Sequence, residues 1–136
     1  MGKRVYVATK YEVEYDSNAA FNWKQQEFKE LLSNLNCDVM EDDEDGYSDT
    51  WQVSKEQFKR AIDFLKGNKE EIYNYEENEV IEFEDEDFWY EEIYDAIMDM
   101  IDKSEFEECY QYVLSTMETF YEQADKKCNY MHFTAF

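Results

Sequence analysis

The residues of this chain whose number and spacing most clearly indicate a chemical role are Asp and Glu. Of 136 residues, 35 are Asp or Glu and 13 are Lys or Arg, which gives a formal net charge of -22. Between Lys69 and Lys103 there is no positive residue, and that interval holds fifteen acids. A second cation-free interval, from Glu30 to Ser54, holds eight more. Carboxylates concentrated in this way suit a cationic partner surface, a metal ion or acid–base chemistry.

One run of these acids is spaced to lie along a single face of a helix. It comprises Glu91 or Glu92, followed by Asp95, Asp99 and Asp102. Carboxylates four residues apart lie about 6 Å apart along a helix axis, and a DNA strand presents one phosphate per roughly 3.4 Å of its axis. The run therefore approximates alternate phosphates, and we expect it to contact a basic protein surface. A merely solvated face that keeps the protein soluble is the competing interpretation.

Aromatic side chains accompany the acids. Tyrosine and tryptophan are preferred interface anchors, and their ring faces hold Arg and Lys through cation–π contacts. One small core cannot take all of Trp23, Trp51, Tyr73, Tyr75, Trp89, Tyr90 and Tyr94. We therefore predict a partner-binding site formed by Glu84, Asp85, Asp87, Trp89, Tyr90, Glu91, Tyr94, Asp95, Asp99 and Asp102. The alternative is that most of these rings simply pack inside.

The spacing of acids in residues 41–52 approaches that of a calcium-binding loop. Asp43, Asp45 and Asp49 fall on the third, fifth and ninth positions of an EF-hand loop. The twelfth position is Gln52, however, where such a loop needs a bidentate glutamate. We therefore predict no specific metal site, and Asp43, Asp45 and Asp49 stay weak candidates for a divalent cation.

Nucleophilic chemistry has few candidate residues. His132, the single histidine, could act catalytically with Cys109 or Cys128, but no glycine-rich phosphate loop, nucleophile elbow or metal-ligand cluster accompanies them. The three cysteines, which include Cys37, stand at wide spacings that argue against a disulfide framework. We therefore expect a non-catalytic protein without a cofactor. Free thiols and the lack of a signal-peptide pattern favour a cytoplasmic location.

Alternating apolar residues predict the strands that must position these side chains. A period of two predicts a long strand over residues 4–15, and further patterns predict strands at 47–53 and 129–136. Residues 68–87 permit either a hairpin or a helical turn. Partial alternation there favours a strand at Val80–Phe83.

Helical spacing of apolar residues predicts four helices. They cover residues 20–36, the stretch between Ser54 and Gly67, residues 89–101 and residues 104–124. An S-x-x-Q motif opens the second helix and an S-x-x-E motif opens the fourth, and both have the form of a capping box. Only about two residues separate the third helix from the fourth, so we expect those two to form an antiparallel hairpin.

The predicted architecture is a single α+β domain spanning residues 1–136. A small sheet, made of the long N-terminal strand, the C-terminal strand and one or two others, packs against about four helices. The chain has 43% hydrophobic and 18% aromatic residues, which is not the composition of a disordered protein. It contains no proline, repeat or low-complexity linker that would mark a domain boundary.

In composition, the chain resembles the acidic DNA-mimicking inhibitors that phages and mobile elements direct against restriction or CRISPR nucleases. The resemblance covers no diagnostic motif, and it implies an inhibitor that binds a basic, nucleic-acid-binding protein. One alternative is an immunity protein against a toxin nuclease, whose active-site cleft is also basic. Another is a carboxylate-based metal-dependent enzyme or divalent-cation binder. In the favoured interpretation the partner is a basic protein surface, with no direct nucleic-acid contact and no membrane.

Overall fold

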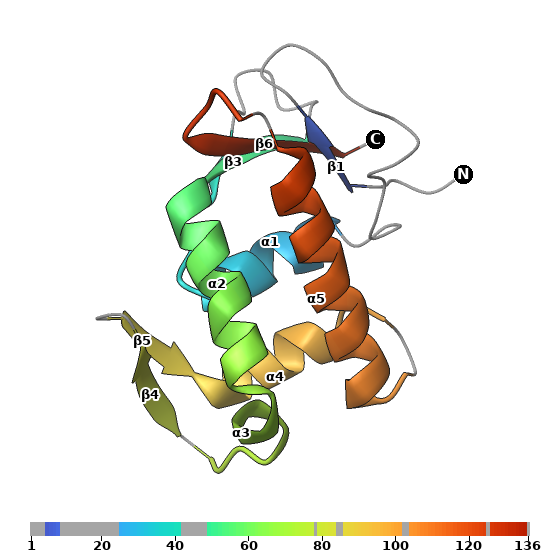
Figure 1. The fold of residues 1–136 in the computed structure, drawn as a ribbon. Coiled ribbons are helices and arrows are strands. Elements are labelled where there is room, and N and C mark those ends of the chain that lie inside the picture. Colours follow the sequence, from blue (N-terminus) through green and yellow to red (C-terminus); the bar gives the residue numbers. More distant parts are fainter. Residues whose placement is uncertain are drawn as a thin grey trace.

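The predicted α+β class is confirmed by the computed structural model of the chain. The structure describes residues 5–8, 25–41, 49–77, 79–83, 86–101, 104–124 and 126–135. The elements in chain order are β1 (Val5–Ala8), α1 (Gln25–Asn34), β2 (Met40–Glu41), β3 (Asp49–Ser54), α2 (Lys55–Gly67), α3 (Lys69–Tyr73), β4 (Val80–Phe83), β5 (Glu86–Trp89), α4 (Tyr90–Met98), α5 (Phe106–Gln123) and β6 (Tyr130–Ala135). Figure 1 shows a sheet at one end of the molecule, with α2 and α5 extending from it toward α3, α4 and the β4–β5 hairpin at the other end.

The larger sheet has the strand order β1-β6-β3-β2, and every neighbouring pair is antiparallel. Trp51 and Val53 of β3 stand opposite Phe133 and Met131 of β6. All four side chains are buried, and the rings of Trp51 and Phe133 stack with centroids 5.4 Å apart. Because side chains alternate between the faces of a sheet, these residues give it one apolar face.

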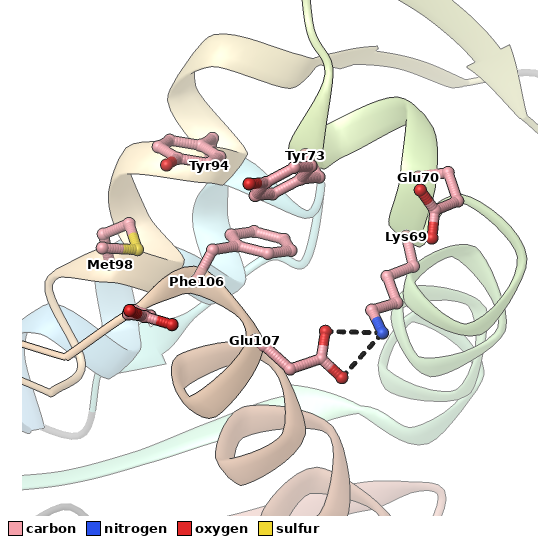
Figure 2. A pocket seen from close by; sticks show the side chains of 8 residues that line it. Lys69, Glu70, Tyr73, Tyr94, Met98, Phe106 and Glu107 are labelled. Atoms are coloured by element: carbon pink, nitrogen blue, oxygen red, sulfur yellow. Dashed lines mark hydrogen bonds and ion pairs between the residues drawn. The ribbon is translucent and has the colours of Figure 1, made fainter.

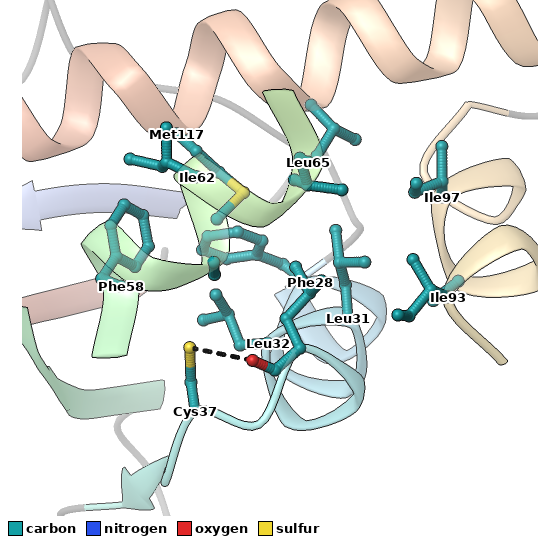
Figure 3. Packing of buried hydrophobic residues seen from close by; sticks show 14 of the residues in the cluster. Phe28, Leu31, Leu32, Cys37, Phe58, Ile62, Leu65, Ile93, Ile97 and Met117 are labelled. Atoms are coloured by element: carbon teal, nitrogen blue, oxygen red, sulfur yellow. Dashed lines mark hydrogen bonds between the residues drawn. The ribbon is translucent and has the colours of Figure 1, made fainter. Parts of the chain in front are cut away.

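Phe28 of α1 joins the helices to this apolar face. Its side chain is fully buried, and its ring lies 5.7 Å from that of Phe133, 6.4 Å from that of Trp51 and 5.9 Å from that of Phe120 in α5. These separations are typical of favourable aromatic pairs. Figure 3 shows Phe28 in the same cluster as Leu31, with side chains of α2 and α4 nearby. The core therefore runs continuously from the sheet into the helices.

Two residues after the end of α1, Asn36 has a left-handed backbone, with φ at 62°. The N–H of Cys37 donates to the carbonyl of Leu32 at 2.9 Å, and the N–H of Asn36 donates to the carbonyl of Ser33 at 3.0 Å. This is the pairing of a Schellman motif, in which asparagine takes the position that glycine usually fills. The helix consequently ends at Asn34, earlier than the residue 36 predicted from apolar spacing.

Asn36 also ties the β4–β5 hairpin to two helices. Its side-chain Nδ2 donates to the carbonyl of Asp87 in β5 at 2.6 Å. Its own carbonyl accepts a hydrogen bond from the guanidinium of Arg60 in α2 at 2.7 Å. That guanidinium lies 3.6 Å from the carboxylate of Glu86, also in β5. One turn after α1 therefore fixes the hairpin against α1 and α2.

The predicted start of α2 is confirmed, although its capping box is incomplete. The hydroxyl of Ser54 accepts a hydrogen bond from the N–H of Gln57 at 3.5 Å. The Gln57 side chain turns to Asp38 instead of back to Ser54: its Oε1 accepts from the Asp38 N–H at 2.8 Å, and its Nε2 donates to the Asp38 carboxylate at 3.1 Å. At the other end, Gly67 is the last helical residue and Asn68 is the C-cap.

Residues 68–87 contain both structures that the sequence permitted. The short helix α3 covers 69–73, and the strand predicted at Val80–Phe83 is confirmed as β4, which pairs with β5. Trp89, predicted to begin the third helix, is instead the last residue of β5 opposite Val80. The N–H of Tyr90 donates to the carbonyl of Glu79 at 3.1 Å, so strand pairing extends to the first residue of α4.

The connection between α4 and α5 is longer than predicted. Helix α4, the third that the sequence predicted, ends at Met98, although apolar residues continue at helical spacing to Ile101. The chain turns after Met98, and Met100 is still buried. Helix α5 begins at Phe106 with Glu105 as its N-cap and no side-chain capping bond, so the predicted capping box at Ser104 is wrong. Residues 99–105 therefore join helices that were expected to be about two residues apart. The two helices pack against each other.

Several predictions fall partly outside the described residues. The strand predicted over 4–15 is confirmed where it is described, as β1, and its continuation over 9–15 lies outside. Residues 20–24 of the first predicted helix and residues 47–48 of the second predicted strand also lie outside. In the part of the chain that the structure describes, no helix has both the length and the hydropathy that crossing a membrane requires.

Because Tyr90 is buried, we expect the protein to lose stability measurably at alkaline pH. The Tyr90 hydroxyl donates to Asn68 Oδ1 at 3.3 Å, and burial together with Glu71 and Glu79 raises its pKa to about 12. The unfolded value is about 10, so the fold favours the protonated form. The contribution of Tyr90 to the free energy of unfolding is complete below about pH 10, and it decreases as the pH rises toward the pKa of the folded state.

Urea unfolding of the wild type and of Tyr90→Phe across this range measures the effect. Near neutral pH the variant loses about 1 kcal/mol, the typical worth of one hydrogen bond. Its free energy of unfolding should then fall less steeply with rising pH than that of the wild type. Parallel curves for the two proteins would contradict the assignment.

Candidate functional site

A pocket of about 540 Å³ lies where α3, α4 and the start of α5 meet (Figure 2). Its lining residues are Lys69, Glu70, Tyr73, Tyr94, Met98, Glu105, Phe106 and Glu107. The volume is in the range of small-ligand pockets. Aromatic and acidic side chains make up most of this lining, and that combination sets its chemistry.

Three aromatic rings form one wall of the pocket. The rings of Tyr94 and Phe106 are parallel within 3°, with centroids 5.1 Å apart. The ring of Tyr73 lies 5.3 Å from that of Phe106, at an angle of 50°. Phe106 is buried, Tyr94 is half-buried and Tyr73 is 56% exposed. The wall therefore begins in the core and ends in solvent, and its exposed rings are held by a buried one.

Three carboxylates, one ammonium group and the side chain of Met98 complete the lining. Lys69 Nζ lies 2.6 and 2.8 Å from the two carboxylate oxygens of Glu107 (Figure 2). This hydrogen bond is the main reason that the pKa of Glu107 lies below its usual value. Glu70 and Glu105 are exposed, and no described residue forms an ion pair with either of them. The pocket therefore has two carboxylates available to a cationic guest.

Tyr75 extends the aromatic wall toward the acids of α4. Its ring lies 5.2 Å from that of Tyr94. Burial raises the pKa of Tyr75, and the nearby charges of Asp95 and Glu91 raise it further. The predicted residues Glu91, Tyr94 and Asp95 are thereby brought together around one aromatic ring.

A shallower acidic hollow adjoins the pocket and shares Glu70 with it. Its volume is about 450 Å³, and its lining residues are Glu70, Glu71, Asn74, Glu76 and Glu79. We call the pocket, this hollow, Tyr75, Glu91 and Asp95 together the acidic aromatic surface. The packing of α3 against α4 makes it continuous although its members are far apart in sequence.

The predicted acidic face of α4 is confirmed where it is described. Ile93 and Ile97 are fully buried, Asp95 and Asp99 are exposed, and Glu91 is half-buried. The helix ends before Asp99, which is its C-cap. The helical run of acids is therefore shorter than the sequence predicted, and a long array of phosphate-like spacing does not form within α4.

Two of the predicted aromatic contact residues have different environments. Trp89 is 49% exposed at the end of β5, where a partner can reach it. Tyr90 is 1% exposed, and its ring lies 6.0 Å from that of Phe64 in the core. The prediction that Tyr90 contacts a partner is therefore wrong, because strand pairing at Trp89 turns the next side chain inward. Trp51, another of the aromatic residues predicted to exceed the capacity of one small core, is also buried.

The remaining predicted site residues divide into described and undescribed ones. Asp87 is exposed on β5, and Asp49 is the first residue of β3. Those outside the described residues are Glu84, Asp85, Asp102, Asp43 and Asp45. Within the described residues, no group of three or more His, Cys, Asp or Glu side chains could hold a metal ion.

Most of the pocket lining escaped the sequence prediction. Tyr73 was among the aromatic residues predicted to exceed the capacity of one small core. No pattern in the sequence placed Glu70, Glu105 and Phe106 in the same site. The pocket forms because α3 folds back onto α4 and α5, a contact between segments more than thirty residues apart for Tyr73 and Phe106. The acidity of the region and its Tyr residues were the signals that the sequence offered.

Comparisons with protein-family models, with curated proteins and with solved structures found no match to this chain.

The Lys69–Glu107 pair predicts how the pocket's own charges respond to mutation. In Lys69→Met the pKa of Glu107 should rise toward the usual value of a glutamate, because the hydrogen bond that lowers it is gone. NMR titration of the side-chain carboxyl carbons measures this shift. Thermal stability should change little, since Glu107 is exposed and Lys69 is only half-buried, so that solvent screens the pair.

Lys66→Met is the matched control. Its ammonium pairs with Glu118 at 3.5 Å, also on α5, so the same charge is removed without touching Glu107. The assignment would be wrong if both variants left Glu107 unchanged, or if both raised its pKa equally.

Proposed function

We propose that this protein is a non-catalytic binding protein whose acidic aromatic surface holds a cationic segment of a partner protein. The observation that carries the proposal is the pocket between α3, α4 and α5, in which three aromatic rings stand beside three carboxylates. Rings attract a cation through their negative faces, and carboxylates attract it by charge and hydrogen bonding. The combination suits a side chain that is both flat and positive.

An arginine side chain fits this description better than a lysine. A guanidinium group is planar, stacks on aromatic rings and donates two parallel hydrogen bonds to one carboxylate. Glu70 and Glu105 are available to receive such bonds, whereas Glu107 is already paired with Lys69. A lysine ammonium offers a point charge without the stacking face. We therefore expect the partner to present arginine to this pocket.

The charge distribution supports a partner that is basic over a wide area. The chain carries a net charge of -22, and no cation lies in the sequence between Lys69 and Lys103, which includes all of α4. On α2, by contrast, Lys59 pairs with Asp63 and Lys66 pairs with Glu118. A predominantly negative surface of this kind steers an oppositely charged protein toward the site.

The class of partner that we propose is a protein whose basic surface ordinarily holds nucleic acid, such as a nuclease. An inhibitor of a restriction-type nuclease and an immunity protein against a toxin nuclease would use the same surface chemistry. Direct binding of nucleic acid is disfavoured, because phosphates and this surface repel each other. We place the protein in the cytoplasm, where a reducing environment keeps Cys37, Cys109 and Cys128 as the free thiols seen in the structure.

A short arginine-rich peptide tests the pocket directly, with affinity measured by fluorescence anisotropy. Removing both available carboxylates in Glu70→Gln/Glu105→Gln should weaken binding roughly fivefold, the effect of two exposed charge pairs. Binding should also weaken as salt rises, since screening shortens the Debye length from about 10 Å at 0.1 M to about 3 Å at 1 M.

Glu56→Gln/Glu122→Gln is the charge-matched control. Both residues are exposed. Glu56 is in the first turn of α2, directly after β3, and Glu122 is in the last turn of α5, shortly before β6. The sheet lies at the end of the molecule opposite α3 and α4, which line the pocket (Figure 1). This variant should bind the peptide nearly as well as the wild type. Equal weakening of the two variants would show that long-range charge alone attracts the peptide, and the pocket would lose its assigned role. A lysine-rich peptide that bound as tightly as the arginine-rich one would remove the preference for arginine.

A further inference from the structure

Cys128 and His132 form a close sulfur–imidazole contact at the far end of the molecule from the pocket. Cys128 Sγ lies 3.3 Å from His132 Nε2. Both residues are half-buried, so neither is sealed in the core. An extended chain would separate residues four apart by roughly 13 Å, and the turn before β6 brings these two together.

The fold holds both partners of this contact in place. His132 lies on β6 between Met131 and Phe133, which face the core and are fully buried. Because strand side chains alternate, the imidazole is on the opposite face of the sheet. The carbonyl of Asn129 accepts a hydrogen bond from the N–H of Lys55 at 3.0 Å, which anchors the residue after Cys128 to the start of α2.

The contact places beside Cys128 an imidazole nitrogen that accepts a proton in one of the two neutral tautomers of histidine. Cys37 and Cys109 are buried, and burial raises the pKa of both, that of Cys37 to about 12. Their sulfur atoms contact main-chain carbonyls, such as Gln57 O for Cys37 at 3.6 Å. Cys128 combines partial exposure with an imidazole nitrogen, the arrangement that activates nucleophilic thiols.

We propose that Cys128 and His132 are a reactive thiol–imidazole pair that takes small neutral hydroperoxides and becomes oxidised at Cys128 to a sulfenic acid. The thiol proton passes to His132 Nε2, and the thiolate attacks the terminal oxygen of the hydroperoxide. A sulfur–oxygen bond forms while the oxygen–oxygen bond breaks, so sulfur is oxidised by two electrons and the peroxide is reduced. The departing alkoxide or hydroxide takes the proton from the imidazolium and leaves as an alcohol or water.

The charge of the protein favours a neutral oxidant over an anionic one. A net charge of -22 repels anionic oxidants and anionic disulfides at long range. Lys126 and Lys127, which precede Cys128 in the chain, are exposed. A half-buried sulfur also admits a small molecule more readily than a bulky one. Hydrogen peroxide and small alkyl hydroperoxides meet both conditions.

Alkylation by the neutral reagent iodoacetamide measures the nucleophilicity of each thiol in the folded chain, with the modified residue identified by mass spectrometry. The reference is a synthetic peptide of residues 125–131, which keeps Lys126, Lys127 and Cys128 but lacks His132 and the fold. Burial alone can only slow the folded protein. Because a free thiol is a few per cent ionised near neutral pH, proton sharing should make folded Cys128 react roughly tenfold faster than the peptide.

His132→Gln supplies the matched variant, because glutamine keeps a hydrogen-bonding side chain but takes no proton near neutral pH. In this variant, Cys128 should react no faster than the peptide. In wild-type protein treated with hydrogen peroxide, a sulfenic-acid probe should label Cys128 before Cys37 and Cys109. A folded wild-type protein whose Cys128 reacts more slowly than the peptide would overturn the proposal without reference to any variant. So would sulfenic acid forming equally fast at all three cysteines.

Discussion

Folding of this chain depends on aromatic packing that outweighs the mutual repulsion of its carboxylates. Around Phe28, the rings of Trp51, Phe120 and Phe133 pack in edge-on, tilted or stacked geometry, and each such side chain contributes about 1.5 to 3 kcal/mol through burial. Among the described residues no Asp or Glu is buried as a whole, although one carboxylate oxygen of Glu27 is shielded from solvent. The buried charged residue is Lys29, whose ammonium lies 5.0 Å from the centroid of Trp51. Apolar groups and acids are therefore separated into an interior and a surface.

At the acidic aromatic surface, aromatic residues of the core and carboxylates of the surface lie next to each other. Phe106 belongs to the core, yet its ring stacks on the half-buried Tyr94 and contacts the exposed Tyr73. Packing against the core therefore holds the exposed rings in place beside the carboxylates of Glu70 and Glu105. A site supported in this way keeps its shape before a partner arrives, which lowers the entropic cost of binding. Its position on three elements also explains why no short motif marks it.

Local sequence signals predicted the elements better than their contacts. The cap at Ser54, the apolar face of α4 through Ile93 and Ile97, and the strand at Val80–Phe83 all follow from patterns within a few residues. Trp89 was assigned to the wrong element and Tyr90 to the wrong environment, because pairing with β4 overrides helical spacing. The pocket and the contact of Cys128 with His132 depend on chain reversals, which periodicity does not encode. Sequence could predict the acidity of the surface, but not which acids meet which rings.

The central claim is that a cationic side chain enters the pocket between α3, α4 and α5. Two-dimensional NMR of the protein bound to an arginine-rich peptide tests it most directly, through nuclear Overhauser effects between the peptide's arginine side chains and the protein's rings. A cationic side chain in the pocket should give such effects to Tyr73 and Tyr94, with the largest chemical-shift changes in α3 and the first turn of α5. Shift changes spread over the acids of many elements, with none at those two rings, would contradict it.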